Sequence, residues 1–411
     1  MLIQFNFGNF KSYKNLTSLD MTATSIKEHP ENLISSKKDE KHLKSVAIYG
    51  SNSSGKSNII NAFEHMQFLV LTSFSEASKR THIPLKRFQL DAKSKDMPSK
   101  FEVFFTIFDI EYQYGFELTS KEIKEEWLYK RDYRGKNKYS LIFERNNQKF
   151  ELSEKMQPLK ELLKSVTEQT LLLSFLANTA NEDTKNVNKW FLETEVIDFG
   201  DPFWDALQTK ILPSDCFKED NSKEFKDFLK AIDVGIESIR VEEIFKNENK
   251  NNENPSYKAF SVHKNTDTNT YTELILSEES SGTLKMINLY SFLKTSLQKG
   301  LTLFVDELDA KLHPLLTRYI INLFNSENNN NAQLIFSTHD VTNLNKDIFR
   351  RDQIWFVEKN NDMSSNLFSL SEIKADGNSK IRNDASYNKD YLNGRYGAIP
   401  ILSDFNTGGE E

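Results

Sequence analysis

The sequence contains a single cysteine, Cys216, in 411 residues. One thiol cannot form an internal disulfide, which excludes a disulfide-stapled scaffold and agrees with a cytoplasmic location. No apolar run approaches the roughly 20 residues that a membrane-spanning helix needs. The first five residues also lack the basic and then apolar pattern of a secretory signal. We therefore expect a cytoplasmic chain that has no contact with a membrane.

Positive charge is also scarce. The 53 Lys and Arg residues are outnumbered by 60 Asp and Glu residues, which gives a net charge of −7. Proteins that coat DNA are usually more basic, so contact with nucleic acid would require a local basic patch. The sequence has no visible repeat and no long heptad run, which argues against an extended coiled coil. Its 38% hydrophobic content is ordinary for a folded protein of one large or two modest units.

Hydrophobic periodicity divides the chain into segments. Alternating apolar residues over 1–20 and 101–144 predict strands, the second set as an antiparallel meander. The Lys-, Glu- and Leu-rich segment 155–245 has helical spacing, and residues 22–44 have little pattern and predict a loop. After residue 256, strand-like and helix-like pieces alternate, which predicts parallel strands.

The predicted fold class is α/β, with a mixed sheet that has a parallel core, an antiparallel meander lobe and a compact, mostly helical insertion. Four units are predicted, and they are 1–154, the mainly helical insertion 155–256 with a polar loop at 246–255, 257–375, and a tail at 376–411.

The clearest motif is a phosphate-binding loop. It follows the apolar run 45–49 and precedes a helical period that starts at Asn58. Glycines let the backbone curl so that its amides surround phosphates, and the following helix N-terminus favours an anion. We expect Lys56 to reach the β- and γ-phosphates and the Ser57 hydroxyl to ligate Mg²⁺. The predicted nucleotide-binding residues here are Gly50, Ser51, Asn52, Ser53, Ser54, Gly55, Lys56, Ser57 and Asn58.

A second candidate is the apolar run 301–305, which ends in Asp306 and Glu307. Apolar strands of this kind lie centrally in parallel sheets, and ligands bind at their carboxyl ends. Asp306 is expected to orient Mg²⁺, and Glu307 to polarise the attacking water. Taken alone, the same residues also fit an acidic surface turn.

Two further segments carry small or polar residues at element ends. Ser280, Ser281 and Gly282 precede a helical run, so they suit either an anion or an ordinary serine N-cap, and the cap is the simpler interpretation of the segment alone. His339 follows another apolar strand, 32 residues after Glu307, which leaves room for one helix and a returning strand. We therefore expect His339 beside Glu307, in contact with the γ-phosphate.

Four motifs of this sequence, taken in chain order, resemble those of ABC-type ATPases. They are the phosphate loop and the segments 280–283, 305–307 and 337–339. The opening 5–13 (FNFGNFKSY) is similar to that of the soluble branch with the RecF, SMC, Rad50 and OLD proteins. The segments 306–314 and 394–398 resemble a group of bacterial anti-phage defence ATPases that includes RloA, the AbiL ATPase and the PARIS ATPase. The units 1–154 and 257–375 are then the two lobes of an ATPase head.

The resemblance implies roles for individual residues. Glu307 would be the catalytic base and His339 the switch histidine, with ATP and Mg²⁺ bound between two protomers. Ser280, Ser281 and Gly282 would form the signature that serves ATP on the opposite protomer, and Asp309 would belong to the loop that crosses the interface. The segment 280–283 departs from the common signature Leu-Ser-Gly-Gly-Gln. The only candidate for the Mg²⁺-sensing glutamine of the family is Gln89.

The same resemblance implies partners. The last predicted ATPase strand, near 354–358, is followed by 53 residues, and a nuclease domain needs about 100 residues or more. We therefore expect a homodimeric sensor ATPase, alone or in higher assemblies, that acts with a separately encoded effector such as a nuclease. The alternatives are a RecF-like DNA-repair ATPase that binds DNA when it binds ATP, and a nucleotide-switched scaffold with negligible turnover, against which Glu307 speaks.

Overall fold

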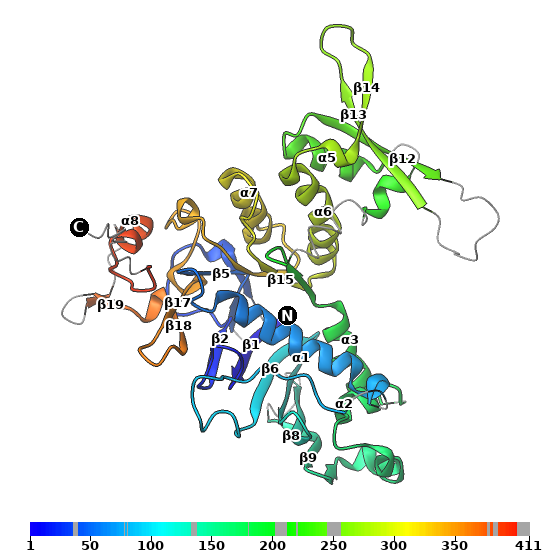
Figure 1. Cartoon of the computed structure of the whole chain (residues 1–411), viewed down its shortest axis with the longest axis vertical. Helices are drawn as coiled ribbons and strands as arrows, with labels where there is room; N and C mark the ends of the chain where they lie inside the picture. Colours follow the sequence, from blue (N-terminus) through cyan, green and yellow to red (C-terminus); the bar gives the residue numbers. More distant parts are fainter. Residues whose placement is uncertain are drawn as a thin grey trace, which may run out of the picture.

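The computed structural model of the chain is elongated, with a meander lobe at one end, a central sheet and a projecting hairpin at the other end (Figure 1). None of the helices in the described part of the chain is long and apolar enough to cross a membrane. The structure describes residues 1–35, 40–77, 79, 81–132, 138–179, 181–201, 212–218, 221–244, 256–375, 379–380 and 385–400.

The first sheet is antiparallel and has the order β10-β9-β8-β7-β6-β1-β2. Alternate residues of its strands are buried, as in the pattern of Phe5 and Phe7, so one face covers the core. The predicted N-terminal strands and the predicted meander are confirmed. The strands are β1 (Leu2–Gly8), β2 (Thr17–Asp20), β6 (Ser99–Ile107), β7 (Ile110–Leu118), β8 (Ile123–Asp132), β9 (Ser140–Asn146) and β10 (Lys149–Leu152).

The second sheet has the order β11-β15-β16-β5-β17-β18, and every neighbouring pair is parallel except β17 with β18. Its central strands are buried on both faces, which explains their continuous apolar sequences. This confirms the predicted α/β class with a parallel core. The strands are β5 (Ser45–Gly50), β11 (Glu195–Asp198), β15 (Thr302–Asp306), β16 (Gln333–Ser337), β17 (Ile354–Lys359) and β18 (Ser365–Ser369).

Helices cover both faces of this second sheet. Phe63 of α1 stacks on Phe304 of β15, with ring centroids 4.3 Å apart, and also meets Phe5 of β1 at 5.5 Å. Helix α1 therefore fills the space between the two sheets, while α6 and α7 pack on the opposite face with Leu303 and Phe336. The helices are α1 (Lys56–Glu76), α2 (Leu172–Leu176), α3 (Glu182–Glu193), α5 (Lys223–Ala231), α6 (Ser281–Lys299), α7 (Pro314–Asn325) and α8 (Tyr387–Leu392).

The segment 155–256 differs from a purely helical insertion. It holds α2, α3 and α5, but also β11, which joins the edge of the second sheet beside β15. It then begins a three-stranded sheet that projects from the molecule (Figure 1). The polar loop 246–255 lies outside the described residues. This sheet consists of β12 (Ile236–Ile244), β13 (Ser256–Lys264) and β14 (Tyr271–Ile275).

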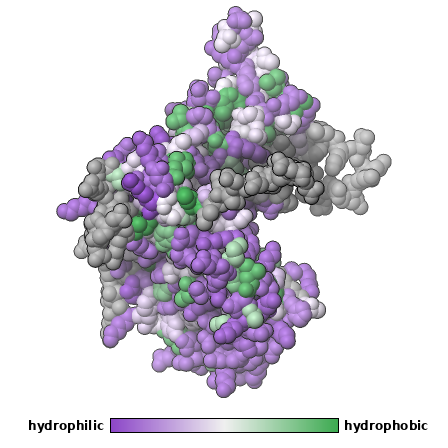
Figure 2. Space-filling model, turned by 60° about the vertical axis from the view of Figure 1, so that its left-hand side comes forward, coloured by the Kyte–Doolittle hydropathy of each residue, from purple (hydrophilic) through white to green (hydrophobic). Residues whose placement is uncertain are grey.

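Figure 2 shows that the tip of this projection is hydrophilic and that hydrophobic side chains begin lower down. Leu274 and Ile275 of β14 are exposed by 44% and 36%. The predicted loop 22–44 also contains a short hairpin. The remaining short elements are β3 (Leu33–Ser35), β4 (Lys41–Leu43), β19 (Lys374–Ala375), β20 (Ser379–Lys380) and the 3₁₀ helices η1 (Pro30–Asn32), η2 (Glu154–Ser165), η3 (Ser214–Phe217), η4 (Leu276–Glu278), η5 (Val341–Asn343), η6 (Arg351–Gln353) and η7 (Leu370–Glu372).

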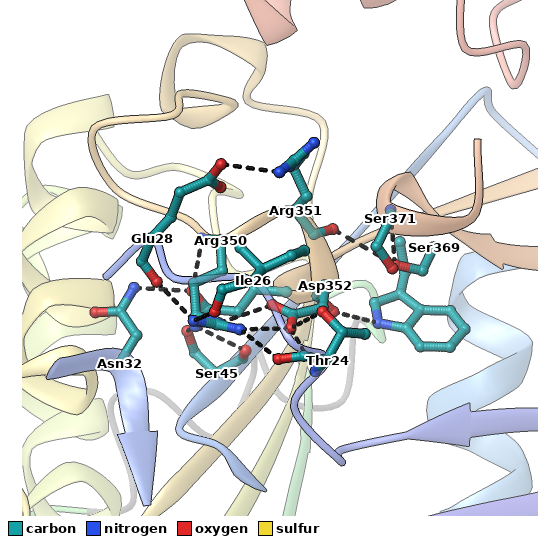
Figure 3. Close-up of polar contacts among 12 residues, drawn as sticks. Thr24, Ile26, Glu28, Asn32, Ser45, Arg350, Arg351, Asp352, Ser369 and Ser371 are labelled. Atoms are coloured by element: carbon teal, nitrogen blue, oxygen red, sulfur yellow. Dashed lines mark hydrogen bonds and ion pairs between the residues drawn. The ribbon is translucent and has the colours of Figure 1, made fainter. Parts of the chain in front are cut away.

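A buried arginine fixes the N-terminal loop to the second sheet (Figure 3). Arg350 has no exposed surface, and its guanidinium donates to both carboxylate oxygens of Asp352 at 2.9 and 2.8 Å. It also donates to the carbonyls of Thr24, Ile26 and Glu28. Asp352 also accepts from the amide and hydroxyl of Thr24, so this pair of side chains just before β17 holds the loop before β3.

Replacing Arg350 by alanine should lower the free energy of unfolding by about 3–5 kcal/mol, because the Asp352 carboxylate would stay buried without its cation. Chemical denaturation measures the loss. Arg240 is the matched control, since it also pairs bidentately with a carboxylate, that of Glu273, but on the surface. Arg240→Ala should leave the denaturation midpoint nearly unchanged. Equal midpoints for the two variants would contradict a structural role of Arg350.

Candidate nucleotide site

The phosphate loop lies between β5 and α1, the arrangement that its sequence predicts. The Lys56 ammonium is 5% exposed and donates to the carbonyls of Gly50 at 3.0 Å and Ser51 at 3.1 Å, so it lies inside the loop. Burial lowers the pKa of Lys56, while the carboxylates of Asp306, Glu307 and Asp309 act in the opposite direction. An anion inside the loop would stabilise the charged ammonium in the same way.

The far end of the loop is closely packed. Gly55 has φ 117°, and a side chain there would meet the hydroxyls of Ser12 and Ser365, so only glycine fits. Asn58 donates to the Ser12 hydroxyl at 2.8 Å. Ser54 is 1% exposed, and its buried hydroxyl has no hydrogen-bond partner among the described residues. Ser53 has a positive φ of 60°, while Asn52 is exposed.

The acidic pair follows β15, as expected. The Ser337 hydroxyl of β16 donates to the Asp306 carboxylate and accepts from the Glu307 amide at 2.9 Å. Glu307 itself has a backbone φ of 52°, which residues other than glycine rarely adopt. Such residues are concentrated at functional sites. The turn is therefore fixed from the neighbouring strand.

His339 lies at the end of β16, next to this turn. Its backbone amide donates to both carboxylate oxygens of Asp309 at 3.2 Å. Burial lowers the pKa of the His339 imidazole, and the nearby Lys56 ammonium lowers it further. Because β15, β16 and β5 are adjacent and parallel, Asp306, Glu307 and His339 reach one sheet edge beside Lys56.

Two residues of this edge carry no signal that the sequence patterns detect. Asp198 ends β11 and pairs in register with Asp306, and burial raises its pKa, with a further contribution from Asp306. A Cβ built on Gly200 would lie 3.1 Å from Asp198 Oδ1 and 3.3 Å from the Glu307 carboxyl carbon, so the two carboxylates flank this glycine. By contrast Gln89 is exposed, and its amide donates to the Arg87 carbonyl.

Lys285 is the second residue without a sequence signal. It lies fully buried on α6, and its ammonium donates to the carbonyls of Glu307, Leu308 and Ala310 at 3.1, 2.9 and 2.8 Å. The one feature of the sequence that could have indicated this role is a lysine on an otherwise apolar face of the helix. Lys285 links α6 to the turn that carries Glu307.

The predicted signature lies at the N-terminus of α6. Ser280 caps the helix by accepting from the Thr283 amide at 3.1 Å, which is the simpler of the two interpretations, and Ser281 is the first helical residue. A Cβ on Gly282 would lie 2.6 Å from the Lys311 carbonyl oxygen, so packing within the chain requires this glycine. Among the described residues, no hydrogen bond joins Ser280, Ser281 or Gly282 to the phosphate loop.

The donor set suits Mg²⁺. Within the described parts of the chain, no group of three or more His, Cys, Asp or Glu side chains is arranged to hold a metal ion. Mg²⁺ is usually bound by one or two protein oxygens together with phosphates and water. The hydroxyl of Ser57 and the 2% exposed carboxylate of Asp306 fit that requirement.

Two cavities lie on either side of the phosphate loop. One, of about 590 Å³, is lined by residues 50–52 and His339, together with residues from 391 to 400. The other, of about 480 Å³, is lined by Lys11, Ser12 and the segment 85–90. The first cavity therefore adjoins the loop itself, and the second adjoins Ser12, whose hydroxyl accepts a hydrogen bond from Asn58 just after the loop.

Residues 45–345 match the family model described as "AAA domain, putative AbiEii toxin, Type IV TA system". No curated protein matches the sequence. Three similar solved structures each match 90% of this chain. They are an SMC head bound to the C-winged helix domain of ScpA (14% identity, TM-score 0.42, 98% of that chain), the SMC head domain from Thermotoga maritima (13%, 0.41, 98%) and the SMC head with an extended coiled coil bound to the C-terminal domain of ScpA derived from Pyrococcus furiosus (12%, 0.37, 96%).

Proposed function

Since the chain belongs to this family of AAA domains, we propose that it is a regulatory ATPase that controls a separately encoded effector, such as a nuclease, in a bacterial anti-phage defence system. The observation that carries the ATPase proposal is the convergence of Lys56, Asp306, Glu307 and His339 at one sheet edge. The defence role is supported by the toxin–antitoxin description of the family and by the resemblance of 306–314 and 394–398 to defence ATPases.

The geometry supports one orientation of the nucleotide. The triphosphate lies along the loop amides, with the γ-phosphate at the Lys56 and His339 side and the adenosine toward Lys11 and Ser12. Lys56 and the loop amides offset the phosphate charge. Ser57 and Asp306 would hold Mg²⁺, which would supply further neutralisation of the phosphate charge.

Hydrolysis requires a water in line with the γ-phosphate. The Glu307 carboxylate orients that water and accepts its proton, while His339 donates a hydrogen bond to a γ-phosphate oxygen. Lys285 donates a hydrogen bond to the Glu307 carbonyl, and the Glu307 amide donates one to the Ser337 hydroxyl. These two bonds keep Glu307 in its unusual backbone conformation before the substrate arrives. Such preorganisation is a large part of how enzymes lower the barrier to phosphoryl transfer.

The site is completed by a second copy of the chain. Ser280 and Gly282 lie at an exposed helix N-terminus, which suits an anion held by another protomer. Asp309 lies beside His339 at the same edge and would face the partner subunit. ATP would then join two protomers into a dimer, and hydrolysis would release them.

A phage challenge tests this role. Cells carrying the chain with its neighbouring genes should resist phage, and Lys56→Ala should abolish the resistance. Resistance that is unchanged without the chain would contradict the defence role. DNA binding that requires ATP and weakens steeply with salt would instead support the RecF-like alternative.

A further inference from the structure

The C-terminal segment 387–400 packs against the end of the second sheet, beside the phosphate loop. Tyr391 of α8 is 6% exposed and stacks on Phe356 of β17, with ring centroids 5.2 Å apart. Its ring centroid also lies 6.3 Å from that of Tyr49, the residue before Gly50. The segment is thus attached to the strand that leads into the loop.

The sequence after α8 forms a compact turn. The Tyr391 hydroxyl donates to the Ala398 carbonyl at 3.1 Å, and Arg395 pairs with Asp390 at 2.8 Å. Gly397 has φ 68°, and a Cβ there would lie 2.8 Å from a carboxylate oxygen of Glu358, so a larger residue would displace the turn. The residue types in 391–398 are therefore constrained by the packing of this turn against β17.

One side of this turn lines the cavity at the γ-phosphate side. Residues 50–52 and His339 contribute polar groups to the cavity lining, and Tyr391, Leu392 and Pro400 belong to the same lining. The Leu392 residue is 62% exposed, so it adds little to the core. Leu392 is thus an exposed apolar side chain beside the phosphate loop, where a change of charge can act on a bound nucleotide.

Tyr49 is also part of the cavity wall. Tyr49 lines the cavity and is 1% exposed, and its hydroxyl has no hydrogen-bond partner among the described residues. Buried hydroxyls are normally paired. The Tyr49 hydroxyl is therefore an exception to this rule, beside the cavity that Tyr391 and Leu392 also line.

We propose that the C-terminal segment forms one wall of the nucleotide site at its γ-phosphate side, where Leu392 contributes to the preference for ATP over ADP. This inference rests on the proposed ATPase function and adds a residue range to it. An apolar wall strengthens the attraction between Lys56 and the phosphates because it lowers the local dielectric. Since the wall faces the γ-phosphate, it distinguishes ATP from ADP.

Charge placed at Leu392 tests the inference. Leu392→Glu should weaken ATP binding about tenfold through repulsion, whereas Leu392→Lys should leave it equal or tighter. The difference between these two variants should be smaller for ADP, which lacks the γ-phosphate, and should shrink as salt rises. Titration calorimetry of the full chain with Mg²⁺-ATP and Mg²⁺-ADP measures these affinities.

Leu162 provides the matched control. It is 49% exposed on η2, which packs on β10 of the meander lobe, so its Glu and Lys variants should bind ATP equally. Equal ATP affinities for Leu392→Glu and Leu392→Lys would overturn the inference, and so would an equal effect on ATP and ADP. Both outcomes leave the proposed ATPase function intact, because that function is tested separately by ATP binding and hydrolysis of the unaltered chain.

Discussion

Lys56→Ala should bind ATP at least about 100-fold more weakly than the unaltered chain, a loss of roughly 2.7 kcal/mol. The ammonium lies inside the loop, where it is nearly inaccessible to water, so its hydrogen bonds to phosphate are charge-assisted and strong. Alanine removes this charge and also leaves the carbonyls of Gly50 and Ser51 without their donor. Titration calorimetry with Mg²⁺-ATP measures the loss.

The chain offers a closely matched control at the other end of β5. Lys44 is also 5% exposed, and its ammonium donates to the Ser326 carbonyl at 2.7 Å. Lys44→Ala should therefore lose stability through the same kind of change while keeping its affinity for ATP. If both variants lose affinity equally, the effect of Lys56→Ala reflects folding rather than phosphate binding.

Glu307→Gln should bind ATP normally and hydrolyse it about 100- to 1000-fold more slowly, because an amide cannot accept the proton of the attacking water. The neutral side chain has almost the same shape, so the turn held by Lys285 and Ser337 should persist. With turnover stalled, the ATP-bound dimer should accumulate. Phosphate release measures the rate, and light scattering with and without ATP measures the mass.

Glu195 is the control for this second variant. Its carboxyl lies at the amino end of β11, in the same sheet but away from the edge that carries Glu307. Burial raises the pKa of Glu195, so it is also a partly buried acid. Glu195→Gln should hydrolyse ATP at the normal rate. A normal rate for Glu307→Gln would show that another group activates the water.

The parts of the fold with strong local patterns could be predicted from the sequence. The apolar run before Gly50 and the helical period after Asn58 fixed β5 and α1, and alternation fixed the meander. The strand β11 was not predicted, because its four residues follow directly on α3 and it pairs with β15 more than 100 residues later. A ladder formed at such a distance leaves no local periodicity.

The site was predictable to the same extent. Lys56, Glu307 and His339 follow recognisable strand ends, and adjacency of parallel strands then brings them together. Asp198 was hidden with its strand, and Lys285 resembles any helical lysine until its three carbonyl partners are seen. Contacts of this kind depend on how the elements pack, which a single sequence does not encode in its spacing.

The position of Lys285 has a consequence for two copies of the chain. In the proposed dimer, the start of α6 would bind the nucleotide of the partner protomer, while the turn that Lys285 contacts would act in hydrolysis of the nucleotide on its own protomer. Nucleotide binding at the first residues of α6 would then be coupled, through this helix and Lys285, to the carbonyl of Glu307. Neither protomer would then hydrolyse ATP alone, and a dimer with a single ATP would keep its effector bound.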